Sequence, residues 1–294
     1  MALDKNLIQR SITGTLFVAV LVGAIMWHPL SFGFLFLLIT VLGLWEFLGL
    51  AEKAGAQPLR TYGTLAGALC FTLSFMAKRS DNNMLLLGII PLLFIVFFAE
   101  LYRKKEQPFT NIAYTILAVI YVALPFSLWA LVIVPIDNDV IGKFNASVFP
   151  QAYIAHLLEY RWHLLLGFFI LMWTSDTMAY VCGRLFGKHK LFERVSPKKT
   201  WEGTIGGGLF ALGAAWLVSI YFTDLPLIHW LVIAAIVVVC GNLGDLSESL
   251  FKRSIGVKDS GTILPGHGGF LDRFDAVLLA SPFVATYLLI IPVH

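Results

Sequence analysis

Long apolar segments dominate this chain and limit what it can fold into. About nine segments approach the length needed to cross the hydrocarbon core of a membrane, which is about 20 mostly apolar residues. They cover residues 12–27, 30–50, 62–77, 84–101, 112–134, 164–182, 204–221, 227–243 and 274–293. Hydrophobic residues make up 58% of the chain and charged residues only 13%, which excludes an ordinary soluble globular protein.

The segments are continuously apolar rather than alternating, which excludes membrane-spanning strands. We therefore predict an all-α integral membrane protein, a polytopic bundle of about nine transmembrane helices. Residues 1–294 form one membrane domain, with the first five spans and an outer loop in 1–161 and the last four spans and their cytoplasmic loops in 162–294. The first span is expected to be a retained helix rather than a cleaved signal peptide, because His28 and Pro29 follow it in place of small cleavage-site residues.

Basic residues divide unequally between the connecting loops, and this division predicts how the chain crosses the membrane. Lysine and arginine gather in the short cytoplasmic connections of membrane proteins. With the N-terminus in the cytoplasm, all but four of the 21 basic residues fall on the cytoplasmic side. The exceptions are Lys78, Arg79, Lys143 and Arg161. We therefore expect a cytoplasmic N-terminus and a C-terminus outside.

The eighth apolar segment continues into a polar stripe. Asn242, Asp245, Ser249 and Lys252 are spaced i, i+3, i+7 and i+10, which puts them on one narrow face of a helix. The stripe directs a carboxylate, a hydroxyl and an ammonium group toward the same volume, so it combines a metal ligand with a phosphate-binding group. Glu248 lies off the centre of this face. A solvated helix end is the alternative interpretation.

A glycine-rich loop follows this stripe. Its glycines prevent a long regular helix and allow main-chain amides to approach a ligand closely. Arg253, Lys258 and His267 are interleaved with these glycines. A glycine-rich loop alone is weak evidence for phosphate binding, but glycines interleaved with basic residues favour a phosphate-binding segment. We include Gly268 and Gly269 in this predicted binding loop.

Two aspartates open the ninth apolar segment, one helical turn apart. Asp272 and Asp275 lie at the same predicted membrane level as Asp245. Carboxylates suit Mg²⁺, which commonly takes one or two of them together with substrate phosphates, so the three aspartates predict a Mg²⁺ site. Arg273 either pairs with these aspartates structurally or binds substrate. Zinc is disfavoured because His267 has no second His or Cys at ligand spacing.

Ionisable residues at membrane depth are costly and often functional. Asp176 lies in the sixth apolar segment, about 10 Å below a basic cytoplasmic loop at 1.5 Å per helical residue. This position favours a polar site, and a hydrogen bond to a neighbouring helix is the alternative. Glu46, between Trp45 and Phe47 near the end of the second segment, is interpreted as an interfacial anchor and not as a site residue.

Lys198 and Lys199 differ from the other basic residues of their loop. They lie beside the hydroxyls of Ser196 and Thr200, just before an expected helix start, where backbone amides and the helix dipole favour anions. We expect both lysines to bind phosphate. For the rest of this loop, attraction to anionic lipid is sufficient explanation.

These motifs resemble the signature of the phosphatidate cytidylyltransferase family. The matching residues are Ser249-x-Phe251-Lys252-Arg253, Lys258-Asp259-x-Gly261, Pro265-x-His267-Gly268-Gly269 and Asp272-Arg273-x-Asp275. The resemblance extends over roughly residues 176–275, and the first five spans resemble the family only in hydropathy and length.

The resemblance implies a nucleotidyltransferase that converts CTP and phosphatidic acid to CDP-diacylglycerol and pyrophosphate, with Mg²⁺ as cofactor and a second cation left open. The aspartates matching Asp245 and Asp272 are implicated as metal ligands in the family, and we add Asp275. The expected catalytic residues are Asp245, Asp272, Lys258 and His267. The expected substrate-binding residues are Asp176, Lys198, Lys199, Ser249, Lys252, Arg253, Gly268, Gly269 and Arg273.

Two other functions fit part of the sequence. A CTP-dependent lipid kinase, like the dolichol and phytol kinases, would transfer the γ-phosphate to an alcohol and release CDP. A secondary transporter would also place acids such as Asp176 inside the membrane, but the charged clusters of this chain lie at one membrane face rather than near the midplane.

The loop charges place the expected site on the cytoplasmic side, where CTP is available. The compact form resembles bacterial members of the family, so we expect a multi-pass protein of the inner membrane. The expected partners are CTP, phosphatidic acid and the lipid bilayer, with a homodimer implied by resemblance alone and no nucleic acid.

Overall fold

The computed structural model describes residues 5–141, 155, 157–261 and 268–291. The chain divides into two compact units. The first combines Met1–Trp162 with Ser260–Leu271, and the second combines His163–Asp259 with Asp272–His294. A short segment late in the sequence therefore belongs to the unit that is built mostly from the N-terminal helices.

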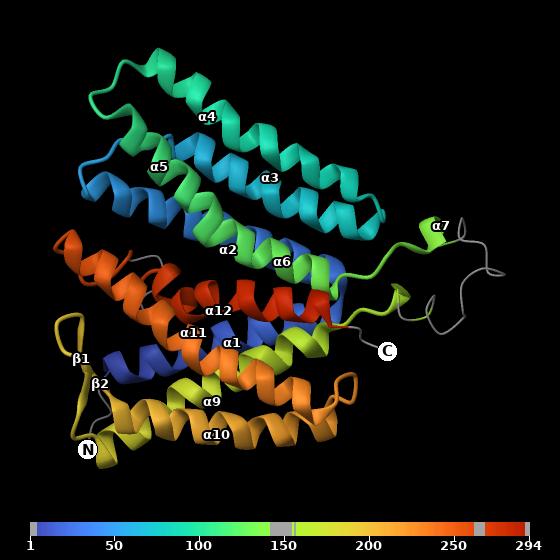
Figure 1. Cartoon of the computed structure of the whole chain (residues 1–294), viewed down its shortest axis with the longest axis vertical. Coiled ribbons are helices and arrows are strands. Elements are labelled where there is room, and N and C mark those ends of the chain that lie inside the picture. The colour runs from blue at the N-terminus through green and yellow to red at the C-terminus, as the bar shows by residue number, and fades with distance from the viewer. Residues whose placement is uncertain (1–4, 142–154, 156, 262–267, 292–294) are drawn as a thin grey trace. The chain divides into compact units, whose positions relative to one another are not determined.

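The described part of the first unit is helical (Figure 1). Its elements are α1 (Lys5–Trp27), α2 (Pro29–Lys53), α3 (Arg60–Arg79), the 3-10 helix η1 (Asn83–Gly88), α4 (Ile89–Arg103), α5 (Pro108–Ala118), the π-helical η2 (Val119–Ala123), α6 (Leu124–Ile133) and the short α7 (Asn138–Ile141). Helix α2 begins where His28 accepts a hydrogen bond from the Leu30 N–H at 3.1 Å, with Pro29 at the first helical position.

Helix α2 is tightly held within the first unit. It packs against α1, α3 and α5. Its Phe36 ring meets Phe126 of α6 edge-on at 5.5 Å between ring centroids, and its Phe32 ring lies 6.3 Å from Phe71 of α3. Phe32 and Phe36 are completely buried. This packing gives the polar residues of α2 a rigid support.

The described part of the second unit contains four long helices and one small hairpin. Its elements are α9 (Trp162–Phe186), β1 (Lys190–Phe192), β2 (Ser196–Thr200), α10 (Trp201–Tyr221), α11 (Leu227–Ser254) and α12 (Leu271–Ile290), of which α9 and α12 each have their first residue in the first unit. The two strands pair antiparallel, with Lys190 opposite Thr200. We did not predict this hairpin, which falls in the basic loop between two spans.

Glycines allow the helices of the second unit to approach closely. A Cβ at Gly207 of α10 would lie 2.6 Å from the carbonyl oxygen of Ser175 on α9. A Cβ at Gly244 of α11 would lie 2.6 Å from the carbonyl oxygen of Asp275 on α12. Small residues at helix contacts are typical of membrane bundles, where close van der Waals packing drives association.

The helices confirm a polytopic, essentially all-helical membrane protein. Seven described helices are long and apolar enough to cross a membrane. They are Pro29–Lys53, Asn83–Arg103, Pro108–Ile133, Trp162–Phe186, Trp201–Tyr221, Leu227–Ser254 and Leu271–Ile290. The apolar part of α1, Ile12–Trp27, is shorter, and α3 falls outside this set. The count of about nine crossings and the sidedness of the ends therefore stay predictions.

Candidate active site

The polar stripe forms one side of a continuous helix, as predicted. Helix α11 runs without interruption to Ser254, so Asp245, Ser249 and Lys252 lie on successive turns of one face. Ser249 Oγ donates a hydrogen bond to Asp245 Oδ1 at 3.2 Å. Lys252 is only 8% exposed, so this residue of the stripe is not solvated, whereas Asp245 and Ser249 are half-buried.

An ion pair links the hairpin to this stripe. Lys199 Nζ of β2 lies 2.7 Å from Asp245 Oδ2 and 3.4 Å from Asn242 Oδ1. The strand places Lys199 directly before α10, whose N-cap Thr200 accepts a hydrogen bond from the Gly203 N–H at 3.2 Å. Asp176 of α9 interacts electrostatically with both Lys199 and Asp245. The Lys199–Asp245 ion pair therefore joins two residues that the sequence singled out separately, and Asp176 is within electrostatic range of both.

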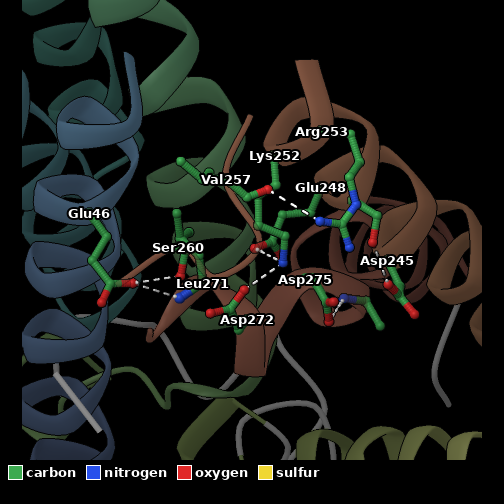
Figure 2. Close-up of polar contacts among 12 residues, drawn as sticks. Glu46, Asp245, Glu248, Lys252, Arg253, Val257, Ser260, Leu271, Asp272 and Asp275 are labelled. Atoms are coloured by element: carbon green, nitrogen blue, oxygen red, sulfur yellow. Dashed lines mark hydrogen bonds and ion pairs between the residues drawn. The ribbon is translucent and has the colours of Figure 1, made fainter. Parts of the chain in front are cut away.

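A second ion-pair group lies further along α11. Lys252 Nζ donates to Asp272 Oδ1 of α12 at 2.5 Å and lies 3.1 Å from Glu248 Oε1. Figure 2 shows the Lys252 ammonium group between these two carboxylates. The side chains of all three residues are at most 13% exposed. Burial strengthens such pairs electrostatically, but it makes any unpaired member costly.

Glu248 is a residue of this group that sequence analysis left out. It is 3% exposed, and neither of its oxygens has a hydrogen bond of good geometry within the described residues, although Oε1 lies near Lys252 Nζ. It interacts electrostatically with Asp275 and Asp272. Its i,i+4 spacing from Lys252 was a signal that could have included it.

Asp275 lies between the two ion-pair groups. It interacts electrostatically with Asp245, Lys252 and Asp176. Its Oδ1 accepts a hydrogen bond from the Ala276 N–H at 2.7 Å. The close approach of α11 to α12 at Gly244 brings Asp275 into this cluster. The three predicted metal ligands therefore belong to one electrostatic cluster in the second unit.

The composition of this cluster fits a divalent cation that binds together with phosphate. Its carboxylates outnumber its lysines, and this excess negative charge, part of it at the buried Glu248, favours a compensating cation. The members are Asp176, Asp245, Glu248, Asp272, Asp275, Lys199 and Lys252. No three of these carboxylates, all of which are described, bring ligand oxygens within 4.8 Å of one another. Such an open arrangement suits Mg²⁺, which takes few protein carboxylates and completes its shell with substrate phosphates and water.

The remaining predicted residues lie at several places in the structure. Four basic residues are exposed, namely Lys198, Arg253, Lys258 and Arg273. Arg253 Nη1 donates to the carbonyl oxygen of Val257 at 3.4 Å, which holds the chain just after α11. Gly268 and Gly269 belong to the first unit. His267 lies outside the described residues, so its predicted role stays a prediction.

Glu46 has a different environment from the one we predicted. It is 6% exposed, so its interpretation as an interfacial anchor is wrong. Its Oε2 accepts hydrogen bonds from Ser260 Oγ at 3.2 Å and from the Leu271 N–H at 3.0 Å. Figure 2 shows the carboxylate directed toward both donors. The signal for its importance was an acidic residue inside an apolar segment.

Comparison with known proteins identifies the family. The model of the cytidylyltransferase family matches residues 8–291. A phosphatidate cytidylyltransferase of Staphylococcus saprophyticus is 36% identical over 220 residues, which are 74% of this chain and 75% of that protein. One from Staphylococcus haemolyticus is 36% identical over 205 residues, or 69% of each chain. One from Staphylococcus aureus is 48% identical over 124 residues, which are 42% of this chain and 47% of that protein.

The family match extends over both structural units and includes every member of the carboxylate and lysine cluster. The similarity to the first two staphylococcal proteins likewise covers more than two thirds of this chain. The chain therefore belongs to the cytidylyltransferase family and is a nucleotidyltransferase.

Proposed function

We propose that this protein transfers CMP from CTP to phosphatidic acid, giving CDP-diacylglycerol and pyrophosphate. Its membership of the cytidylyltransferase family and its 36% identity to named phosphatidate cytidylyltransferases support this activity. The structural observation that carries it is the cluster of carboxylates and lysines on α9, β2, α11 and α12, in which Glu248 and Lys252 are buried. Such a cluster suits the handling of phosphates with a divalent cation.

The reaction needs little acid–base chemistry from the protein. A phosphate oxygen of phosphatidic acid attacks the α-phosphorus of CTP and forms a new P–O bond. The bond from the α-phosphorus to the oxygen that bridges to the β-phosphate breaks, and pyrophosphate leaves with that electron pair. Because the attacking oxygen is already anionic, no strong general base is required. Catalysis then depends on positioning the reactants and neutralising charge.

The carboxylates would hold Mg²⁺ for this reaction. We assign Asp245 and Asp272 as ligands, with Asp275 as a third, and the further buried oxygens of Glu248 leave a second cation open. Bound Mg²⁺ supplies Lewis-acid stabilisation of the phosphoryl oxygens.

Lysines would supply the remaining positive charge. Lys199 pairs with Asp245, and Lys252 pairs with Asp272. When substrate binds, these ammonium groups would pair with phosphate oxygens in place of the carboxylates. The exposed basic residues would contact the phosphates of CTP, the lipid or the leaving pyrophosphate. These are Lys198, Arg253, Lys258 and Arg273. Asp176 and Ser249 would keep Lys199 and Asp245 in place, and Gly268, Gly269 and His267 would shape the binding loop.

The unequal distribution of loop charges supports a site at the cytoplasmic face of a bacterial inner membrane. We propose about nine crossings, with the N-terminus in the cytoplasm and the C-terminus outside. Within this single membrane domain, residues 162–294 carry the catalytic residues, and two copies form a homodimer. Phosphatidic acid would enter laterally from the inner leaflet.

The deciding experiment follows the label of α-labelled CTP. Detergent-purified protein is incubated with phosphatidic acid, with and without Mg²⁺, in parallel with Asp272→Asn. Labelled CDP-diacylglycerol that forms only with Mg²⁺, and about 100-fold more slowly in the variant, is the expected result. Transfer of label only from γ-labelled CTP to a lipid alcohol would instead identify a lipid kinase.

A further inference from the structure

An acidic side chain within an apolar helix is costly unless it has partners. Glu46, on the rigidly packed α2, finds its partners far along the chain. The Ser260 hydroxyl and the Leu271 N–H, which both donate to its Oε2, lie 214 and 225 positions later in the sequence. Its Oε1 has no hydrogen-bond partner among the described residues.

Two glycines fit around the same carboxylate. A Cβ at Gly261 would overlap with Glu46 Oε1. A Cβ at Gly269 would lie 2.6 Å from Glu46 Oε2 and would also overlap with Ser260 Oγ. A larger residue at either position would require the Glu46 carboxylate to move, and at Gly269 it would also meet the main-chain nitrogen of Gly261. Glu46 therefore touches the segment Ser260–Leu271 near both of its ends, and all of these residues belong to the first unit.

Both hydrogen-bond partners of Glu46, Ser260 and Leu271, are close in sequence to proposed functional residues. Leu271 is the first residue of α12, so its N–H has no acceptor inside that helix. Glu46 Oε2 supplies that acceptor from outside the helix. Asp272, a proposed metal ligand, directly follows Leu271. At the other end, Ser260 comes two residues after Lys258, a proposed phosphate contact.

We infer that Glu46 is a positioning residue for the proposed reaction. Its carboxylate holds the segment Ser260–Leu271 at both ends, through the Ser260 hydroxyl and the Leu271 main-chain N–H, and acts through this segment rather than on substrate. The inference rests on the proposed function. It requires the acceptor oxygen of Glu46 and not its charge, because both of its hydrogen bonds use one oxygen and the other oxygen has no described donor.

Paired substitutions test this requirement. Glu46→Gln keeps an acceptor at the Oε2 position, and we expect its kcat within about fivefold of the wild type. Glu46→Leu has no acceptor, and we expect its kcat to fall about 10- to 100-fold because the loop is misplaced. Equal losses in both variants would overturn the inference, since they would show that the negative charge is what matters.

A double-mutant cycle separates positioning from a general loss of stability. Ser260→Ala should lower kcat about three- to tenfold in the wild type and have no further effect in Glu46→Leu. Thr40→Val is the matched control, because Thr40 is a buried residue of the same helix whose hydroxyl, among the described residues, donates a hydrogen bond only to the Phe36 carbonyl oxygen of that helix, at 2.7 Å. Its kcat should be unchanged. Additive effects of Ser260→Ala and Glu46→Leu would contradict the inference.

Hydrogen–deuterium exchange tests the hydrogen bonds of Glu46 to Ser260 and Leu271 without any activity measurement. Glu46→Leu should speed exchange of the Leu271 amide and its neighbours at residues 268–270, and Glu46→Gln and Thr40→Val should not. If the wild type makes no CDP-diacylglycerol, the proposed function fails. The exchange result still decides whether Glu46 holds the segment Ser260–Leu271 in place. If the wild type is active and Glu46→Leu keeps both its kcat and its slow exchange, the inference fails alone.

Discussion

At the scale of single residues, Lys252 is the cation of a largely buried ion-pair group. Its ammonium group lies between Glu248 and Asp272, and all three side chains are largely buried. Lys252→Met leaves two buried carboxylates without this counter-charge, so we expect a loss of about 3 kcal/mol in unfolding free energy. Chemical denaturation in detergent measures it, and Glu248→Gln in the same background should restore part of the loss. Lys258→Met is the control: its side chain is exposed, so stability should be unchanged while activity falls. Equal stability of both variants would contradict the buried ion-pair group.

At the scale of elements, the close contact between α9 and α10 brings the helix that carries Asp176 near the helix that follows Lys199. Gly207 of α10 lies against the main chain of α9, and overpacking of such a contact costs about 1–3 kcal/mol. We expect Gly207→Val to lower the melting temperature and to reduce CDP-diacylglycerol formation more than about tenfold. Gly213→Val on the same helix is the matched control, because a Cβ there meets nothing within 4 Å. Similar activity in the two variants would show that the spacing of these helices does not position the site.

At the scale of the whole molecule, the direction of the chain through the membrane is the property to test. A variant with alanine at Cys70, Cys182 and Cys240 provides a background without thiols. Into it, single cysteines replace Lys104 and Asp139, both of which are exposed. In intact spheroplasts, a membrane-impermeant maleimide should label Asp139→Cys but not Lys104→Cys, and detergent should make both reactive. This follows from the excess of positive charge expected on the cytoplasmic side. The reverse labelling pattern would invert the proposed topology.

The sequence by itself determined the helices, because a segment in lipid must satisfy its backbone hydrogen bonds internally. It also determined which residues share the polar face of α11, since helical periodicity is a local property. Asp245, Ser249 and Lys252 were predicted correctly on this basis. The hairpin that carries Lys199 was missed, because a short basic loop contains no apolar alternation to indicate strands.

Only the tertiary structure decided which charges meet. Lys199 pairs with Asp245, and Lys252 with Asp272, because glycine contacts set the distances between helices. Glu46 was misread for the same reason. Its neighbours in sequence are aromatic residues typical of a membrane interface, whereas its hydrogen-bond partner Ser260 lies 214 positions away. Sequence spacing predicts contacts within one helix, but partners on different elements depend on how the whole chain packs.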